Sequence, residues 1–409
     1  MPETIDLAAV RAQVPALSRT VHGRPVAYLD HAATAPTPTC VIDALGRAYG
    51  PLNANVHRGV HTMSADATQA FAAARRRVAR FISASADEVV FTSGTTAALN
   101  LVAHGLSATR LRPRSRVLVS RQEHHANLVP WQLVAAPRGA RVEALPCDTR
   151  GGVDLEAAER ALRAGDVAVV CITLASNVLG TLQPVHELTR LAHGVGALVV
   201  ADAAQAAAHG PIDVRALGVD ALAFSGHKLF GPTGVGVAWA RRELLQSWPP
   251  WQGGGDMVTR VTFDGPGFRA PPQRFEAGTP PIAQAIGLHA ALDWLEDIGW
   301  ARIQARETLV RDRIWDRLGE VDGLQLLPGP ADLPMASFTF GRHHPHDVGT
   351  LLDQQGVAVR TGRHCADPIH ALLGLDATVR ASGSFLTTDA EIDRLVDGLR
   401  HVREVLGAP

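Results

Sequence analysis

The stretch ALVVADAAQAAAHGPIDVRALGVDALAFSGHK, residues 197–228, contains two short apolar runs that each end at polar residues. Asp202 closes the first run, and Ser225 with Lys228 closes the second. Short apolar runs of this kind are typical of buried strands in a parallel sheet. Ligands of open α/β sheets bind beyond the carboxyl ends of the strands, so we expect these polar residues to lie at a functional edge.

The same alternation extends over residues 88–240. Strands are expected at residues 89–92, 116–120, 167–176, 197–202 and 221–225. Between them, residues 96–106 and 184–193 carry apolar side chains at helical spacing, as crossover connections between parallel strands require. The sequence therefore predicts an α/β fold with a large, mostly parallel sheet.

A smaller α+β domain is expected after the Gly- and Pro-rich residues 253–281. Two long helical patterns follow, then strand candidates at 336–340 and 357–360, and a last helix that begins at a capping box formed by Thr388 and Glu391. The pattern divides the chain into an N-terminal segment at 1–25 that packs with the small domain, a large domain at 26–280 and a small C-terminal domain at 281–409.

The composition excludes several classes of function. The chain has 409 residues, of which 46% are apolar and 19% charged, and its formal net charge is −1. With no run of Lys or Arg, a nucleic-acid or membrane partner is disfavoured and a small-molecule substrate is expected. Residues 1–18 contain no continuous apolar stretch, which favours a cytoplasmic location. The four cysteines form no CxxC pair, so no metal site or disulfide framework is expected.

Polar residues follow the other expected strands as well. The tetrapeptide SGTT at residues 93–96 opens a helix, where free amides and hydroxyls suit a phosphate, although an ordinary helix cap uses the same residue types. His124 could stack on a ring or move protons, and the alternative is a structural pair with His125. Burying Asp202 at a strand end is unfavourable without a cation, and a protonated pyridine nitrogen would be one.

Lys228 lies away from any charge run and could bond covalently to a carbonyl cofactor, while Ser225 and His227 offer phosphate donors. An exposed lysine in a turn is the alternative. The glycines at 231–236 are spaced GxxGxG and follow the lysine, so they do not form a dinucleotide-binding motif. A phosphate cradle, an imidazole, a strand-end Asp and a Lys, in this order, together match what pyridoxal phosphate requires.

Six blocks carry a resemblance that covers nearly the whole chain: HRGVHT (57–62), EHHAN (123–127), SNVLG (176–180), SGHK (225–228), FEAGTP (275–280) and VRTGRHCA (359–366). In these blocks the sequence resembles fold-type I pyridoxal-phosphate enzymes of the class V aminotransferase group. Within that group it is similar to the type II, Suf-type cysteine desulfurases and selenocysteine lyases. The resemblance implies conversion of L-cysteine, or L-selenocysteine, to L-alanine.

The resemblance also implies roles for individual residues. Lys228 would bind the cofactor covalently, His124 would stack on its ring, Asp202 would pair with its ring nitrogen and Gln205 with its phenolic oxygen. The residues implied for the phosphate are Thr95, Thr96, Ser225 and His227, with Thr279 reaching the phosphate of the other subunit of a homodimer. The residues implied for the substrate are Asn177, Arg380, Arg360 and His57. Arg380 would hold the substrate carboxylate as a bidentate fork.

Cys365 separates a desulfurase from a transaminase. It lies in a polar loop with Arg360, Arg363 and His364, surroundings that favour a thiolate, whereas Cys171 lies inside an apolar strand as a small buried residue. The resemblance implies that Cys365 takes the substrate sulfur as a persulfide. A sulfur-acceptor protein in iron–sulfur cluster or sulfur-cofactor assembly would then receive it.

Several points stay open in the sequence. Arg363-His364 stands where the family carries two histidines, and Leu386-Thr387-Thr388 stands where Tyr-Asn-Thr is commoner; Arg363 either faces the sulfur or points to solvent. The cluster HHPH at 343–346 is interpreted as a solvated loop. The alternative functions are a selenocysteine lyase, a sulfinate-processing or transaminase-like enzyme, and an inactive homologue that binds partners. The intact set of candidate site residues disfavours the last.

Overall fold

A computed structural model of the chain describes residues 5–148 and 150–407. Its centre is a seven-stranded sheet with the order β4-β10-β9-β8-β7-β5-β6. β10 pairs antiparallel with β4 and β9, whereas the pairs from β9 to β6 are parallel, so the predicted α/β fold is confirmed. The strands are β4 (Val89–Thr92), β5 (Arg116–Val119), β6 (Arg141–Ala144), β7 (Val167–Thr173), β8 (Leu198–Asp202), β9 (Ala221–Ser225) and β10 (Gly236–Ala240).

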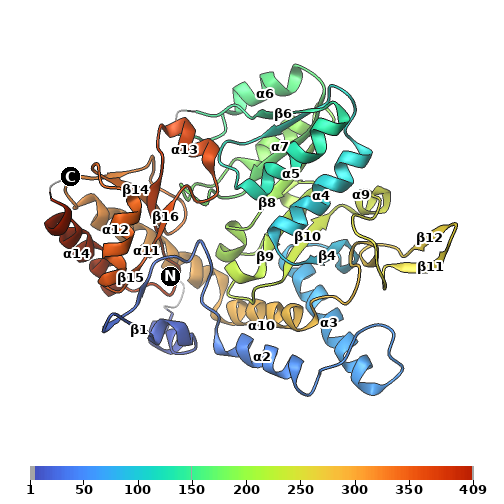
Figure 1. Ribbon diagram of the computed structural model, residues 1–409, viewed down its shortest axis with the longest axis horizontal. Coiled ribbons are helices and arrows are strands. Elements are labelled where there is room, and N and C mark those ends of the chain that lie inside the picture. The colour runs from blue at the N-terminus through green and yellow to red at the C-terminus, as the bar shows by residue number, and fades with distance from the viewer. Residues whose placement is uncertain (1–4, 149, 408–409) are drawn as a thin grey trace.

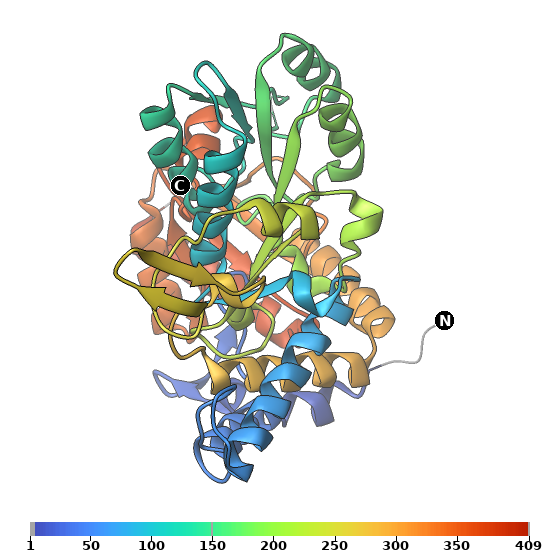
Figure 2. The same ribbon diagram turned by 90° about the vertical axis from the view of Figure 1, so that its right-hand side faces the viewer.

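Helices cover both faces of this sheet (Figures 1 and 2). In β7, Val170 and Ile172 belong to one apolar core, and Val169 and Cys171 belong to the core on the opposite face. Because both faces are buried, the strand sequence is apolar throughout and does not alternate. One layer contains α4 (Thr95–Thr109), α5 (Val129–Ala135) and α9 (Arg242–Ser247), and the other contains α3 (Thr62–Phe81), α6 (Leu155–Arg163), α7 (Val185–His193), α8 (Val214–Leu217) and α10 (Ile282–Ile298).

The expected strands and crossover helices are present, with one clear difference at the end of β7. The strand was expected to reach residue 176, but it ends at Thr173. The N–H of Ser176 donates to Thr181 O, and the N–H of Gly180 donates to Ser176 O, so the chain turns back here. This turn brings Asn177 to the carboxyl edge of the sheet.

The C-terminal part contains a second sheet, with antiparallel pairs in the order β13-β14-β17-β16. Its core is formed with helices α11, α12 and α14. The predicted capping box of α14 is confirmed, since Thr388 and Glu391 exchange backbone and side-chain hydrogen bonds. The elements are α11 (Trp300–Gly319), β13 (Leu324–Leu326), β14 (Met335–Phe340), α12 (Pro345–Gln354), β16 (Arg360–Gly362), α13 (Asp367–Leu373), β17 (Thr378–Ser382) and α14 (Asp389–Leu406).

The prediction of a single strand at residues 357–360 is wrong. The chain forms two short strands there: β15 (Val357–Ala358) pairs parallel with β3 (Ala27–Tyr28), and β16 pairs with β17. The split follows from two different partners, because β3 comes from the N-terminal region and β17 from the C-terminal sheet. Val359 is the link, and it places Arg360 on the sheet that carries Arg380.

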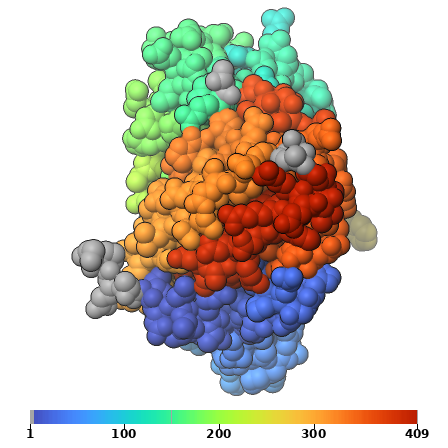
Figure 3. Space-filling model, turned by 90° about the vertical axis from the view of Figure 1, so that its left-hand side faces the viewer, coloured from blue at the N-terminus to red at the C-terminus, as the bar shows by residue number. Residues whose placement is uncertain are grey.

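N-terminal residues lie against the C-terminal part (Figure 3). The Arg11 guanidinium donates hydrogen bonds of 2.9 and 3.0 Å to Glu391. The domain boundaries at residues 25 and 280 stay predictions, and residues 1–4 and 408–409 of the outer two segments lie outside the described part. The remaining N-terminal elements are α1 (Leu7–Arg11), β1 (Thr20–Val21), β2 (Arg24–Pro25) and α2 (Thr39–Tyr49).

The Gly- and Pro-rich stretch contains a hairpin that the sequence did not predict, formed by β11 (Val258–Thr262) and β12 (Gly265–Phe268). The hairpin projects from the body of the molecule (Figure 1), and the side chain of Phe263 between its strands is fully exposed. Among the helices of the described residues, none is both long and apolar enough to cross a membrane.

Candidate active site

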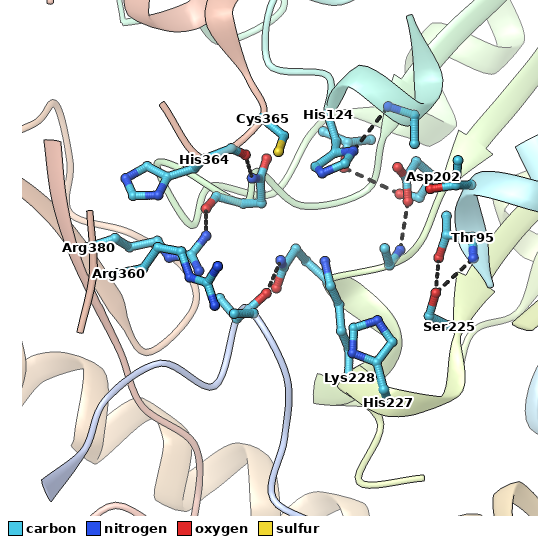
Figure 4. Close-up of a pocket in the computed structure, with 18 of the residues that line it drawn as sticks. Thr95, His124, Asp202, Ser225, His227, Lys228, Arg360, His364, Cys365 and Arg380 are labelled. Carbon is cyan, nitrogen blue, oxygen red and sulfur yellow. Dashed lines mark hydrogen bonds between the residues drawn. The ribbon is translucent and has the colours of Figure 1, made fainter. Parts of the chain in front are cut away.

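A cavity of about 480 Å³ opens at the carboxyl edge of the large sheet. β4 and β9 are both antiparallel to β10, so the loop after β4 reaches the same edge as the loops after β7, β8 and β9. The C-terminal sheet closes the other side (Figure 4). Predicted site residues that line the cavity are Thr95, Thr96, His124, Asn177, Asp202, Gln205, Ser225, His227, Lys228, Arg360, Cys365 and Arg380.

Lys228 and Asp202 form the charged centre of the large-sheet side. Lys228 ends a single 3-10 turn that follows β9 directly. Burial lowers the pKa of Lys228 to about 8, against the opposing effect of Asp202. Burial raises the pKa of the Asp202 carboxyl, which accepts the N–H of Ala204 at 2.8 Å. The lysine is therefore a better nucleophile at neutral pH than an ordinary lysine.

His124 presents a neutral imidazole to the cavity. Its Nδ1 accepts the N–H of Ala126 at 3.0 Å, so the proton of the neutral ring is on Nε2. Burial lowers the pKa of His124 to about 4, and the nearby Lys228 adds to this effect. A neutral, half-buried ring at this position suits stacking on a flat aromatic group.

The N-terminus of α4 and the end of β9 meet at one corner of the cavity. The Thr95 N–H donates to Ser225 Oγ at 2.7 Å, and the two hydroxyls lie 2.6 Å apart. A Cβ on Gly236 would lie 2.4 Å from Gly94 Cα, so only glycine lets β10 approach this loop. N–H groups of a first helical turn have no partner within the helix, and together with these hydroxyls they suit an anion.

The N-terminal region supplies a further wall of the cavity. Gln205 Nε2 donates to Ala32 O at 2.8 Å. The His227 ring lies 3.2 Å from the Thr34 hydroxyl, and the N–H of Ala35 donates to His227 O at 2.9 Å. The turn that carries Lys228 is thus bonded to Thr34 and Ala35, and Gln205 is bonded to the same segment at Ala32.

Sequence reasoning missed Asp30, which lies between the two arginines of the site. Arg360 donates to Asp30 Oδ2 from Nε at 3.1 Å and from Nη2 at 2.8 Å, and Arg380 Nη2 lies 3.3 Å from Oδ1. Arg380 is only 2% exposed, and its Nη1 donates to Asn177 O at 2.7 Å. Asp30 could have been found, because it ends the apolar run at residues 26–29 in the same way that Asp202 ends its strand.

Cys365 is exposed and comes from the opposite side of the cavity. His364 and Cys365 both adopt left-handed backbone conformations, with φ of 51° and 54°. Two donors hold the successive carbonyls: Asn177 Nδ2 donates to His364 O, and the N–H of His125 donates to Cys365 O, both at 2.7 Å. The conformation of the cysteine loop therefore depends on contacts from the loops after β5 and β7 of the large sheet.

The cationic neighbours predicted for Cys365 are engaged elsewhere. The Arg363 guanidinium donates to Asp376 O at 2.9 Å and to Asp367 at 2.8 Å. Asp367 also pairs with the His125 ring at 2.7 Å. Burial lowers the pKa of His364 to about 2, so this ring is neutral, and its Nε2 lies 2.9 Å from the Thr378 hydroxyl.

Two predicted site residues lie outside the cavity. The His57 ring packs edge-on against Phe71, with ring centroids 5.9 Å apart. Thr279 is exposed and lines a separate hollow with Ser93. At the histidine cluster of residues 343–346, His344 caps the start of α12 through the N–H of His346.

Residues 27–395 match the family model described as aminotransferase class-V. The chain belongs to the aminotransferase class-V family. It is 46% identical to a probable cysteine desulfurase of Streptomyces coelicolor over 416 aligned residues, which cover 100% of this chain and 99% of the relative. It is also 46% identical to a cysteine desulfurase of Dickeya dadantii, with 99% and 98% of the two chains covered.

Solved structures agree with this class-V assignment. The crystal structure of the cysteine desulfurase CsdA of Escherichia coli, in an S-sulfonic acid form, superposes with a TM-score of 0.91 at 37% identity, covering 98% of this chain and 100% of that one. With this coverage the likeness extends over both sheets that border the cavity.

Proposed function

We propose that the chain is a pyridoxal-phosphate-dependent cysteine desulfurase that converts L-cysteine to L-alanine and holds the sulfur as a persulfide on Cys365. The observation that carries the proposal is that Lys228 and Cys365 line one cavity. A cofactor site with a reactive lysine would by itself suit a transaminase. An exposed thiol that lines the same cavity adds a sulfur acceptor. The names of the relatives with about 45% identity support the same activity.

The donor set fits pyridoxal phosphate. Asp202 is a buried carboxylate whose charge a protonated ring nitrogen would balance, and His124 is a neutral ring suited to stacking. Thr95 and Ser225 bring hydroxyls and a helix N-terminus to one corner, where a phosphate would bind. Lys228 has the lowered pKa that covalent capture of an aldehyde needs. When bound, the cofactor supplies an electron sink that stabilises negative charge at the α-carbon of an amino acid.

The chain's own residues perform the remaining tasks. Arg380, held by Asn177 and Asp30, is placed to bind the substrate carboxylate. Lys228 is placed to move a proton at the substrate α-carbon, and its pKa near neutrality suits that role.

In the sulfur-transfer step, Cys365 Sγ attacks the substrate sulfur. An S–S bond forms, the substrate C–S bond breaks and its electron pair stays on the carbon fragment, which takes up a proton and leaves as alanine. The products are then L-alanine and a Cys365 persulfide, so atoms and electrons balance without an added oxidant.

The test is to give the purified protein L-cysteine and a reductant and to measure sulfide and alanine together. We expect equal amounts of both, and loss of both together with the yellow cofactor band in Lys228→Ala. Consumption of L-cysteine to give a thiol-bearing 2-oxo acid, with neither alanine nor sulfide, would favour a transaminase-like activity. No consumption of L-cysteine by the cofactor-loaded protein would favour the inactive, partner-binding alternative.

We also propose a homodimer and an acceptor protein. Thr279 is exposed and lines a hollow separate from the cavity of its own chain, so a second copy would be needed for it to reach a phosphate. His57, also outside the cavity, would meet substrate in the same way. Sedimentation of the purified protein tests the dimer. The exposure of Cys365 leaves its sulfur accessible to a partner that accepts it.

A further inference from the structure

Glu123, the first residue of the block EHHAN, is a fully buried carboxylate that does not line the cavity. Its Oε1 accepts hydrogen bonds from Ser120 Oγ at 2.5 Å and from the N–H of Thr173 at 2.6 Å. Its Oε2 accepts from Asn127 Nδ2 at 2.6 Å. These donors are a hydroxyl, a backbone N–H and an amide, all of them uncharged. Burying a carboxylate among uncharged groups is unfavourable, and an apolar residue at this position would avoid that cost.

The Glu123 side chain continues the large sheet where β5 ends. Beyond the paired residues Val119 and Cys171, the N–H of Ser120 donates to Cys171 O at 3.1 Å. Thr173 lies two residues further along β7 and presents its N–H on the same side, where Glu123 accepts it. The carboxylate thus takes the place of a backbone carbonyl of β5 and fixes the loop after β5 to β7.

The bond between Glu123 and Asn127 brackets residues 124–126. Within this segment the His124 ring lines the cavity, and the N–H of His125 donates to Cys365 O at 2.7 Å. One short segment therefore carries both the ring suited to stacking on the cofactor and the donor that holds the cysteine loop. Glu123 is bonded to both ends of the loop and to the sheet, so it fixes this segment relative to β7.

We propose that Glu123 is a positioning residue that couples the two sides of the cavity, because it sets the His124 ring and, through His125, the backbone of Cys365. The inference rests on the proposed function, since it concerns how a cofactor ring and a thiol are held in one arrangement. A buried residue that only stabilises the fold would, in the folded protein, leave both cofactor binding and thiol reactivity unchanged.

Two variants separate hydrogen bonding from packing. Glu123→Met has a similar volume but no carboxylate, so all three donors lose their acceptor. Glu123→Gln keeps one oxygen for the two donors on Oε1, and its NH2 can donate to the Asn127 oxygen once that amide turns. The turn releases the 3.4 Å contact from Trp131 Nε1. Burial, together with the negative charge of Asp202, raises the pKa of Glu123 to about 7, so an uncharged side chain is close to a form already accessible at neutral pH.

The experiment measures two properties of each variant. One is the Kd for pyridoxal phosphate, followed by the cofactor absorbance, and the other is the rate at which iodoacetamide alkylates Cys365 in cofactor-free protein, followed by mass spectrometry. In Glu123→Met the Kd should rise about fivefold or more, because the stacking ring of His124 is no longer fixed. The alkylation rate should rise about threefold or more, because the cysteine loop loses a fixed donor. Glu123→Gln should stay within about twofold of the wild type in both properties.

Glu88→Met is the matched control. Glu88 is also a buried carboxylate that accepts a backbone N–H, from Ser85 at 3.1 Å, but it directly precedes β4 and so lies at the opposite end of that strand from the cavity. This variant should lower the thermal stability without changing either property. If Glu123→Met leaves either property unchanged, or if Glu88→Met changes both equally, the proposal is wrong.

Asn127→Leu covers the case in which Glu123→Met does not fold. It has a similar shape, removes the bond that brackets residues 124–126 and should change both properties in the same direction. No change in either would overturn the proposal. A wild type that does not bind pyridoxal phosphate would reject the proposed function and this inference together. A wild type that binds it, matched in both properties by Glu123→Met, would reject the inference alone.

Discussion

The two sides of the cavity are built differently. On the large-sheet side, Asp202 and Ser225 are the last residues of β8 and β9, and both are buried. On the other side, Cys365 is exposed on a loop between β16 and α13. We call these the cofactor half and the thiol half. Groups that must hold a fixed charge arrangement come from strand ends, whereas the group that must meet both a substrate and an acceptor comes from a loop.

The thiol half is held against backbone strain. Left-handed backbone conformations at His364 and Cys365 cost on the order of 1–3 kcal/mol each for residues other than glycine. The hydrogen bonds from Asn177 and from the His125 backbone offset part of this strain, and both donors lie in loops of the large sheet. In the cofactor half, the hydrogen bond from Thr95 to Ser225 joins two residues of the large-sheet side. This contact therefore does not depend on the C-terminal sheet.

The largest effect expected from the thiol half alone is that of Cys365→Ser. Sulfide release from L-cysteine should fall below detection, because the hydroxyl cannot form a persulfide, while the cofactor band and its change on adding L-cysteine should persist. Mass spectrometry of the wild type should place the extra sulfur on Cys365. If the extra sulfur were found on Cys40 or Cys147, the thiol half would not contain the residue that accepts sulfur. Cys171 is buried inside β7 and serves as an internal control.

Arg380→Ala tests substrate binding at the contact between the thiol half and the large-sheet side, where Arg380 donates to Asn177 O. Loss of a charge-assisted hydrogen bond, worth about 1.5–3 kcal/mol, should raise KM for L-cysteine roughly 10- to 100-fold. kcat should change less, because the carboxylate is bound in ground state and transition state alike. Steady-state kinetics of sulfide release measure both constants. If KM does not change, the carboxylate binds elsewhere, and Arg360 becomes the leading candidate.

Much of the cofactor half was predictable because strand ends can be read from the sequence. Apolar runs located β8 and β9, and residues directly after such runs, including Asp202 and Lys228, do line the cavity. Prediction from the apolar pattern failed at residues 357–360, where the chain changes from one strand partner to another. Pairing with β3 or β17 is decided by residues far away in sequence. The exposed hairpin β11–β12 lay within a Gly- and Pro-rich stretch that gives no strand pattern.

The contacts of the thiol half could not be predicted for the same reason. The bond from Asn177 to His364 O joins residues 187 positions apart, and that between Arg380 and Asp30 joins residues 350 positions apart. Spacing along the chain carries no information on such bonds. Asp30 was identifiable as a strand-end carboxylate, but its pairing with two arginines required the structure.

In the cofactor half, the rate at which Lys228 binds the cofactor should depend on pH. Because the neutral amine is the reactive form and the pKa of Lys228 is about 8, the rate at which cofactor-free protein takes up pyridoxal phosphate should rise with pH and level off above about pH 8. Below that value it should fall about tenfold per pH unit. Absorbance stopped-flow measures it. A midpoint near the ordinary lysine value of about 10.4 would mean that burial does not tune this group.

The smallest effect is expected for Arg363→His, which restores the residue that the family pattern carries beside the cysteine. The Arg363 guanidinium is bound to Asp367 and to Asp376 O, and it is exposed, so solvent and the Asp367 carboxylate screen its charge from the thiol. The rate at which iodoacetamide alkylates Cys365 at neutral pH should therefore differ from the wild-type rate by less than about fivefold. Asn177→Ala is the matched comparison, because it removes a buried contact to the same loop and should change this rate more than Arg363→His does. Both rates are measured without substrate, so a role of Asn177 at the substrate carboxylate does not enter. A larger change in Arg363→His than in Asn177→Ala would mean that surface charge, and not the buried hydrogen bond from Asn177, controls the reactivity of the thiol half.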